Sequence, residues 1–250
     1  MFFWRSAVAA SAVVGTVASA QTGKTAARDT LPPAVITATR VAISTVARTA
    51  TTTVLHSAEL RAHGITRLAD ALRLVPGATV VSGGSLGSLT SLLLRGGNSS
   101  YVRVLVDGVP VNDAGGFIDL ANFTTDNISR IEVVRGPASV LYGSDAVTGV
   151  IQLFTDDGAG QRGLRTTVGG GTHSAERADL SVSGGSARAR YTVAGARQAT
   201  AGILPFNNRY ENAVLSGAVR LTPDAVTDIR FATRWSAAVF QYPKIGRAHV

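Results

Sequence analysis

The feature that most constrains the fold is an alternation of apolar residues with mostly polar ones in the last part of the chain. From Ala213 to Leu221 every second residue is apolar or glycine, while Asn212, Ser216 and Arg220 fall on the other positions. The alternation resumes after a polar turn. There the apolar residues Ile229, Phe231 and Trp235 alternate with the charged residues Asp228, Arg230 and Arg234. Successive side chains of a β-strand point to opposite faces, so both segments predict strands with one apolar and one polar face.

Weaker versions of this pattern at 163–172, 177–186 and 188–197 predict further antiparallel strands after Asp156-Asp157-Gly158. Two architectures fit. In a soluble sandwich the charged residues face outer water, whereas in a membrane barrel the apolar residues face lipid and the charged ones face the lumen. One short turn, one longer loop at 199–209, and the export signal described below favour the barrel. The aromatic content of 6% is low for the interfacial girdles of such barrels and counts against it.

The region from Val35 to Thr155 has a mixed pattern that predicts a small α+β domain. Ser57 and Thr66 are suited to cap two short helices, the second with an apolar stripe. Strands are predicted at 92–94, 102–106, 131–134 and 150–154. Asp107-Gly108 predicts a hairpin, because both central residues of a type I′ turn need a positive φ.

The two ends of the chain read as processing segments. Residues 1–20 combine Arg5, a short apolar run and Ala18-Ser19-Ala20, the layout of a secretory signal peptide cleaved before Gln21. No later segment has eighteen uninterrupted apolar residues, so we expect no helical membrane span. Residues 245–250 resemble translated sequencing-adapter DNA, and we expect them to be a scar that ends a truncated chain.

Composition excludes several classes of protein. The 250 residues are 45% hydrophobic and only 16% charged, which is too apolar for a disordered chain. The absence of cysteine excludes disulfides, thiolate metal sites and a cysteine nucleophile. The net charge of +8 comes from basic residues spread singly, without a basic run, so we expect no nucleic-acid partner.

The stretch 31–40 reads Leu-Pro-Pro-Ala-Val-Ile-Thr-Ala-Thr-Arg. Its prolines keep the start extended, and its β-branched residues favour a strand with no obvious neighbour, suited to join another protein's sheet edge. An ordinary first strand of the domain is an equal alternative. The stretch resembles the energy-coupling box of TonB-dependent outer-membrane receptors. That resemblance implies a TonB box formed by Val35, Ile36, Thr37, Ala38 and Thr39.

Three longer motifs resemble the plug domain of the same family: Leu94-Arg95-Gly96-Gly97-Asn98, the stretch Val104 to Pro110, and the stretch Ile131 to Ala146. With the box they extend the resemblance over about 31–155 in the family's order. It implies a truncated 22-stranded transmembrane β-barrel, whose lumen is wide enough to need a plug. The expected order is signal peptide 1–20, N-terminal segment 21–40, α+β plug domain 41–157, first antiparallel barrel strands 158–244 and scar 245–250.

Within the family, the plug motifs are most similar to those of the vitamin B12 (cobalamin) transporters. Matching the ligand-contacting plug residues of those transporters implies a ligand site at Leu89, Ser91, Asn98, Gly116 and Phe117. Ser91 and Asn98 are suited to hydrogen-bond a corrin's amides, and Leu89 and Phe117 to supply apolar contact. A loop-stabilising role is an equal alternative for each, since Asn98 in particular is able to satisfy its own turn.

One departure from the B12 transporters concerns calcium. Their aspartate-rich calcium loop corresponds here to 200–212, which offers Asn207, Asn208, Glu211 and Asn212 but no aspartate. Calcium prefers several carboxylates, so we expect no metal and no cofactor. The departure also leaves a ferric siderophore or another metal chelate open as the ligand.

Five charged residues of the predicted plug could be taken for acid and base groups: Arg95, Asp107, Glu132, Arg135 and Asp145. No histidine lies near them in sequence, and no nucleophile with an orienting base is evident, so we do not expect an enzyme. We instead expect ion pairs in which plug arginines meet carboxylates of the barrel wall.

Together these features indicate active import of a large, scarce ligand across the bacterial outer membrane, with cobalamin expected first and a ferric siderophore or other chelate as the alternative. Expected partners are the TonB protein in the periplasm, the ligand and outer-membrane lipid, and we expect a monomer. A signalling receptor would need an extra domain before the box, for which 21–31 is too short. A secreted β-rich binding module or adhesin is the alternative from another class.

Overall fold

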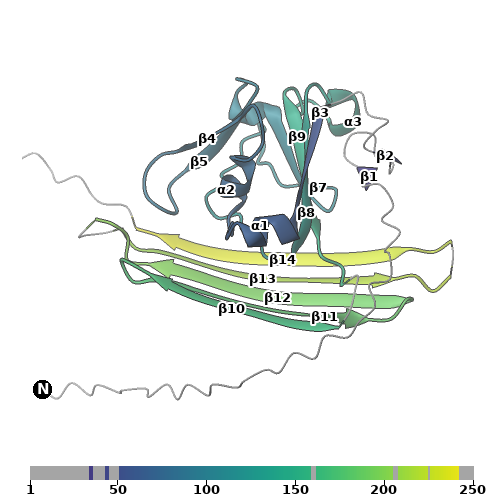
Figure 1. Ribbon diagram of the computed structural model, residues 1–250. Coiled ribbons are helices and arrows are strands. Elements are labelled where there is room, and N and C mark those ends of the chain that lie inside the picture. Colours follow the sequence, from purple (N-terminus) through teal and green to yellow (C-terminus); the bar gives the residue numbers. More distant parts are fainter. Residues whose placement is uncertain are drawn as a thin grey trace, which may run out of the picture. The chain divides into compact units, whose positions relative to one another are not determined.

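The computed structural model describes residues 34–35, 43–44, 51–158, 162–204, 208–224 and 226–241. All of them belong to one of the chain's two compact units, Pro33–Val250. The expected signal peptide and scar lie outside the described residues. Within this unit, a mixed α/β domain is followed by an antiparallel sheet of five long strands, as Figure 1 shows. We call residues 51–158 the N-terminal domain and strands β10–β14 the wall.

The N-terminal domain is built on a five-stranded sheet of order β3-β8-β9-β6-β7, in which only β6 and β9 run parallel among the described pairs. Its strands are β3 (Thr51–His56), β6 (Val102–Val106), β7 (Val109–Pro110), β8 (Ile128–Arg135) and β9 (Gly149–Thr155). A separate hairpin pairs β4 (Ala78–Ser82) with β5 (Thr90–Leu94). The short helices are α1 (Ser57–Ala62), α2 (Leu68–Leu72), the 3-10 helix η2 (Ser99–Tyr101) and α3 (Ser139–Tyr142). Before the domain, β1 (Ala34–Val35) pairs with β2 (Ile43–Ser44). The α+β prediction is therefore confirmed.

The core of this domain forms where the apolar stripe of α2 packs against the sheet. Leu68, Leu72 and Val75 are buried together with Ile131 and Ile151 from β8 and β9. The predicted caps were wrong by one residue: the N-caps are His56 for α1 and Arg67 for α2, and neither side chain makes a cap hydrogen bond. At α2 the Leu68 amide instead donates to the Phe123 carbonyl, so a tertiary contact replaces the local cap.

The Asp107-Gly108 hairpin is confirmed, with φ of 51° and 86° at its two central residues. The turn is also fixed from outside. The Asp107 carboxylate accepts hydrogen bonds from the Thr155 amide at 3.0 Å and the Thr155 hydroxyl at 2.5 Å. This ties the β6–β7 turn to the end of β9, where the chain leaves the domain.

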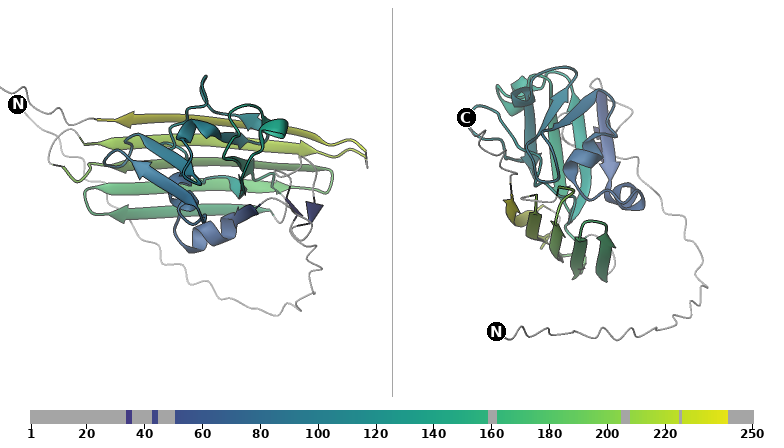
Figure 2. Two further views of the ribbon diagram at one scale, coloured as in Figure 1. Left: turned by 90° about the horizontal axis from the view of Figure 1, so that it is seen from above. Right: turned by 90° about the vertical axis from the view of Figure 1, so that its left-hand side faces the viewer.

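The wall contains β10 (Gly163–Gly171), β11 (Ala175–Gly185), β12 (Ala189–Thr200), β13 (Tyr210–Leu221) and β14 (Ile229–Phe240). All neighbours are antiparallel and follow chain order. The predicted strand segments are confirmed. The right-hand view of Figure 2 looks along the wall and shows the N-terminal domain on one of its faces. No helix in the described part of the chain is long and apolar enough to cross a membrane.

The two faces of the wall have opposite chemistry. On β13, Val214, Ser216 and Ala218 are at most 5% exposed because they face the N-terminal domain. Leu215 lies between them in sequence, points to the other face, and is 54% exposed. It pairs with Trp235, which is 59% exposed on the same outer face. An apolar outer face and a polar inner face are what a membrane barrel requires, whereas a soluble sandwich would carry its charges outside.

Candidate functional site

The inner face of the wall carries arginines on all five strands. They are Arg165, Arg177, Arg190, Arg220, Arg230 and Arg234. Apart from Arg165, their long side chains reach segments of the N-terminal domain that present carboxylates and backbone carbonyls. A guanidinium group has five donors in a fixed plane, so it is suited to bridge several such acceptors at once.

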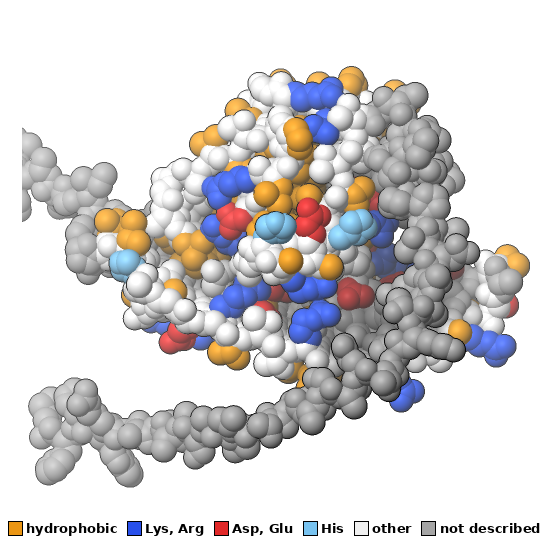
Figure 3. Space-filling model, in the orientation of Figure 1, with side chains coloured by type: hydrophobic (Ala, Val, Ile, Leu, Met, Phe, Trp, Pro, Cys, Tyr) orange, Lys and Arg blue, Asp and Glu red, His pale blue; other side chains and the backbone are white. Residues whose placement is uncertain are grey.

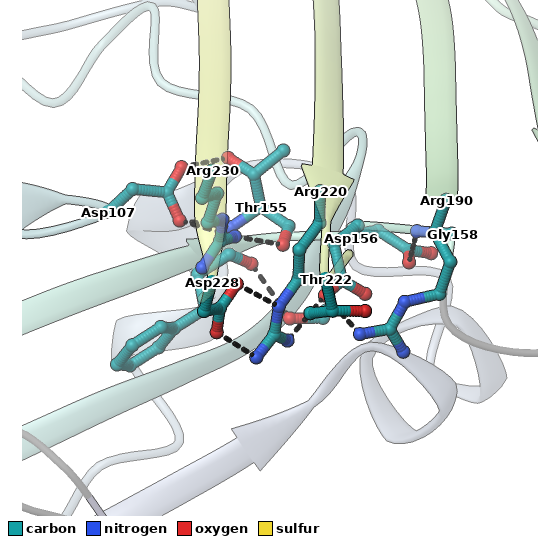
Figure 4. A network of polar contacts seen from close by, with 12 residues as sticks. Asp107, Thr155, Asp156, Gly158, Arg190, Arg220, Thr222, Asp228 and Arg230 are labelled. Carbon is teal, nitrogen blue, oxygen red and sulfur yellow. Dashed lines mark hydrogen bonds and ion pairs between the residues drawn. The ribbon is translucent and has the colours of Figure 1, made fainter. Parts of the chain in front are cut away.

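The first cluster ties the Asp107 turn to β14. The Arg230 guanidinium lies 2.8 Å from the Asp107 carboxylate and donates to the Thr155 carbonyl at 2.7 Å. Asp107 therefore holds both the domain's own β9 and the wall. Figure 4 shows this cluster beside the one described next.

The second cluster is centred on Arg220 of β13. Its guanidinium donates to Asp157 at 2.8 Å and to Asp228 at 2.9 and 2.6 Å, while Arg190 lies 3.5 Å from the same Asp157 oxygen. The hydrogen bonds from Arg220 hold the pKa of Asp228 below its usual range. Asp157 follows β9 directly, so this cluster anchors the segment that connects the domain to the wall.

The third cluster lies around Asp126, in the segment before β8. Arg177 is 2.7 Å from Asp126 and 2.6 Å from Asp179, its neighbour on β11. Arg234 donates to the Asp126 carbonyl at 2.9 Å and to the Thr124 hydroxyl at 2.5 Å. Buried pairs of this kind define a position more than they add stability.

Neutral contacts continue the interface toward the β12–β13 loop. The Tyr210 hydroxyl donates to the Asn122 side chain at 3.1 Å, and the Asn212 amide donates to the Asn122 carbonyl at 3.1 Å. The tip of the β4–β5 hairpin reaches the same end of the wall. There Gly87 has a φ of +90°, and a Cβ at this position would meet the Tyr210 ring at 2.2 Å.

The expected polarity of the ion pairs was wrong. Across this interface the arginines come from the wall and the carboxylates from the N-terminal domain, the reverse of the prediction. Of the five charged residues singled out from the sequence, only Asp107 pairs with the described wall. Arg95 and Arg135 bond to Thr51 and to Pro76 and Thr53, Asp145 pairs with Arg103, and Glu132 pairs with Arg130. The domain's turns hold only short acidic side chains, and the longer arginine side chains of the wall span the gap.

The residues predicted to contact ligand fall into two linked groups. Leu89 is 49% exposed at the end of the β4–β5 loop, and Ser91 is half-buried on β5. Phe117 is 38% exposed beside Gly116, which is buried with a φ of +83°. The groups are joined where the Leu120 amide donates to the Thr90 carbonyl at 2.9 Å.

Asn98 stabilises its own turn, which was the alternative to a ligand contact. Its side-chain oxygen accepts a hydrogen bond from the Ser100 amide at 3.1 Å and so caps η2. The Ser100 backbone in turn lies against Gly116, where an added Cβ would lie 2.4 Å from the Ser100 carbonyl oxygen. Asn98 is exposed, and its side-chain oxygen holds the turn.

The predicted TonB box lies mainly outside the described residues, which include Val35 but not Ile36, Thr37, Ala38 or Thr39. Val35 pairs with Ile43 in the β1–β2 ladder. This pairing gives the start of the stretch a neighbour within the chain, which fits the alternative of an ordinary strand at that point.

Two of the asparagines compared with the calcium loop contact the N-terminal domain. Asn207 lies outside the described residues. Asn208 forms a 2.5 Å hydrogen bond with Ser85 of the β4–β5 loop, and Asn212 faces the N-terminal domain. Glu211 lies on the outer face, 2.8 Å from Arg197.

Sequence reasoning missed Asn122, Asp126 and Asn127, which receive the wall's donors; Asn127 accepts from Thr192 at 3.0 Å. These residues lie between elements with no pattern of their own. The signal available was on the other partner, because an arginine on the polar face of a predicted barrel strand marks a lumen-facing cation that needs an acceptor.

The fold and interface define a class: a membrane barrel wall with a folded domain held against its inner face. Residues 45–150 match the family model of the TonB-dependent receptor plug domain. The N-terminal domain therefore resembles that plug domain, and we call it the plug from here on. This match agrees with the resemblance to TonB-dependent outer-membrane receptors that the motifs at 94–98, 104–110 and 131–146 indicated.

Solved structures confirm the combination of plug and wall. The ferripyoverdine receptor of the outer membrane of Pseudomonas aeruginosa matches with a TM-score of 0.69 and 20% identity over 82% of this chain and 27% of that one. The ferric yersiniabactin uptake receptor of Yersinia pestis matches at 0.60 and 22% over 77% and 32%. A siderophore receptor of Acinetobacter baumannii matches at 0.63 and 20% over 75% and 26%. The chain thus spans about a third or less of these receptors.

Proposed function

We propose that the full-length protein imports a metal chelate across the outer membrane by TonB-dependent transport, as a monomer. The observation that carries this proposal is the plug seated on the inner face of the wall by three ion-pair clusters. A solute that crosses such a barrel must pass a domain that is bound to it. Rearranging that domain requires work, and a protein partner on the periplasmic side is able to supply it.

A ferric siderophore is the ligand class with the best support. The three solved structures compared above are named for siderophores or their iron complexes. The arginines on the inner face also favour an anionic ligand, as many iron chelates are. Cobalamin is the second candidate, because the plug motifs resemble those of its transporters and Ser91 and Asn98 present polar groups that suit its amides.

For the coupling step, we place TonB at Val35 to Thr39. TonB would add as a strand and replace the β1–β2 pairing of Val35 with Ile43. This exchange trades one backbone ladder for another, so it costs little until the box is pulled. Traction on the box would then act on β3, the plug strand that follows it.

The test uses the full-length receptor in cells that lack their own receptors for the ligands offered. Ile36→Pro or Thr37→Pro should abolish uptake of a radiolabelled ferric siderophore and leave its binding unchanged, because proline cannot donate to an added strand. Thr25→Pro, upstream of the box, is the matched control and should transport normally.

Unchanged uptake in both box variants would refute the coupling role. Tight binding of cobalamin without binding of any ferric chelate would replace the ligand. Recovery of the protein from the soluble periplasm would favour the binding-module alternative.

A further inference from the structure

Two arginines differ from the rest of the plug–wall interface. Arg177, Arg190, Arg220, Arg230 and Arg234 each have an acidic or carbonyl partner. Arg165 of β10 and Arg61 of α1 have no hydrogen bond or ion pair with any residue that the structure describes. Burial and then the charge of Arg165 lower the pKa of Arg61, while Asp156 acts in the opposite sense. Both side chains line the same two hollows, so their charges repel, and an anion between them would relieve the repulsion.

Both arginines line the same pair of hollows between the plug and the wall. One has a volume of about 350 Å³ and lies between α1 and strands β10–β12. The next, of about 220 Å³, shares Arg61, Asn127, Arg165 and Ser181 with it and reaches Asp156. Figure 3 shows basic side chains gathered beneath α1, where the plug faces these strands.

A third hollow extends the series toward the loop end of the wall. It has a volume of about 420 Å³, lies under the β4–β5 loop at Ser85, and shares Arg177 with the 350 Å³ hollow. Arg177 at this junction is the residue held by Asp126 and Asp179. The junction also contains buried polar atoms without a hydrogen-bond partner in the described structure, Arg177 Nε and Asp126 Oδ2. Such atoms favour water over a dry contact.

We propose that the three hollows form one passage for anionic solutes along strands β10–β12, and that Arg61 and Arg165 select for negative charge. The Arg177–Asp126 pair divides the passage and would have to open for a large solute. The inference rests on the proposed function only for its natural solute, an anionic metal chelate. The passage itself requires neither TonB nor ligand.

The test places a single cysteine in the passage, which is practical because the chain has none. Ser181 lies on the inner face, is half-buried and lines both hollows that Arg61 and Arg165 share. The full-length Ser181→Cys receptor in outer-membrane vesicles is treated with methanethiosulfonates that carry a sulfonate or a trimethylammonium group. Rates are read by mass spectrometry, with the parent receptor as background.

We expect the anionic reagent to react roughly tenfold faster than the cationic one, as a focused positive potential predicts. Adding Arg61→Gln and Arg165→Gln should bring the ratio close to one. Arg188→Gln removes the same charge from the β11–β12 turn and should leave the ratio unchanged. The ratio is informative because any effect of the arginines on the thiol's own reactivity applies to both reagents.

Equal rates in the Ser181→Cys receptor, or a ratio that survives the double substitution, would overturn the proposal. So would labelling by neither reagent when the denatured receptor labels fully, since strands beyond this chain would then close the passage. The labelling rates are measured without any uptake assay. A failure of this proposal is therefore distinguishable from a failure of the proposed transport function.

Discussion

The inner and outer faces of the wall share one backbone and differ completely in what they can contact. The inner face offers arginines that reach the plug's carboxylates and carbonyls, as Arg230 does with Asp107 and Thr155. The outer face offers exposed apolar side chains such as Phe231, which is 67% exposed. The period of two separates them, so a register shift of one residue would place the arginines in lipid and the apolar residues against the plug. Function in this protein therefore depends on strand register first.

The largest effect is expected from placing a charge on the wrong face. Leu215→Arg puts a guanidinium at the centre of β13 on the outer face and should destabilise the barrel by about 2–4 kcal/mol. Ser236→Arg, an exposed inner-face position on β14, is the control and should fold normally. Denaturant unfolding of the full-length receptor in lipid vesicles measures the difference. Equal stability of the two variants would contradict the assignment of faces.

The next largest effect is expected from removing the Asp107 charge, which joins the plug to the wall. Asp107→Asn keeps the turn, since asparagine tolerates positive φ, but removes the ion pair with Arg230. The opening free energy of β9 amides, from hydrogen exchange in the full-length receptor, should fall by about 1–3 kcal/mol. Asp113→Asn, in the exposed loop nearby, should change nothing. An identical result for both would mean that the wall arginines do not hold the plug.

At the opposite end of the wall, Gly87→Ala should strain the contact between the β4–β5 loop and Tyr210. The loop would have to shift, at a cost of about 1–2 kcal/mol, because φ is +90° and the Cβ would overlap the ring. Gly84→Ala is the control, because its Cβ would make an ordinary 3.7 Å contact with the Ser88 side chain. Proteolytic cleavage rates within 83–89 report the shift. Equal rates would mean that this loop does not pack on the wall.

The smallest effect is expected at Asn98, where two substitutions distinguish a role in holding the turn from a role in contacting ligand. Asn98→Asp keeps the acceptor that caps η2 and loses the amide donor, whereas Asn98→Ala loses both. If the Asn98 side chain also contacts ligand, the Asn98→Asp variant should bind ligand about 1 kcal/mol more weakly without a loss of stability. Titration of purified full-length receptor with ferric siderophores and with cobalamin measures this. If Asn98→Asp leaves the affinity unchanged and only Asn98→Ala lowers it, the role of Asn98 is limited to holding the turn.

The parts that could be predicted are those in which local pattern and tertiary structure agree. Alternation from Ala213 to Leu221 defined a strand, and Asp107-Gly108 defined a hairpin, because each depends on a few neighbouring residues. The docking residues Asn122 and Asp126 could not be predicted, since their role arises only when 121–127 meets the wall. The cap predicted for α2 failed for the same reason, because the Phe123 carbonyl, distant in sequence, accepts the hydrogen bond of the Leu68 amide.

The polarity of the interface shows a second limit. Sequence alone shows charges on both sides but not which pairs are adjacent, so Arg95 and Arg135 were assigned to the wall although they bond to the plug's own groups. Their motifs identify the plug correctly for another reason. Gly96 and Gly136, which follow them, both have positive φ, so these sequences are needed for their turns.

The most direct test of the two-faced wall is a spin-label scan of β13 in the full-length receptor in lipid vesicles, with single cysteines from 212 to 219. We predict a period of two. Labels at odd-numbered positions should collide with lipid-soluble oxygen, and labels at even-numbered positions should be shielded by the plug. Collision of the odd-numbered labels with a water-soluble nickel complex instead would show a soluble sheet and contradict the account.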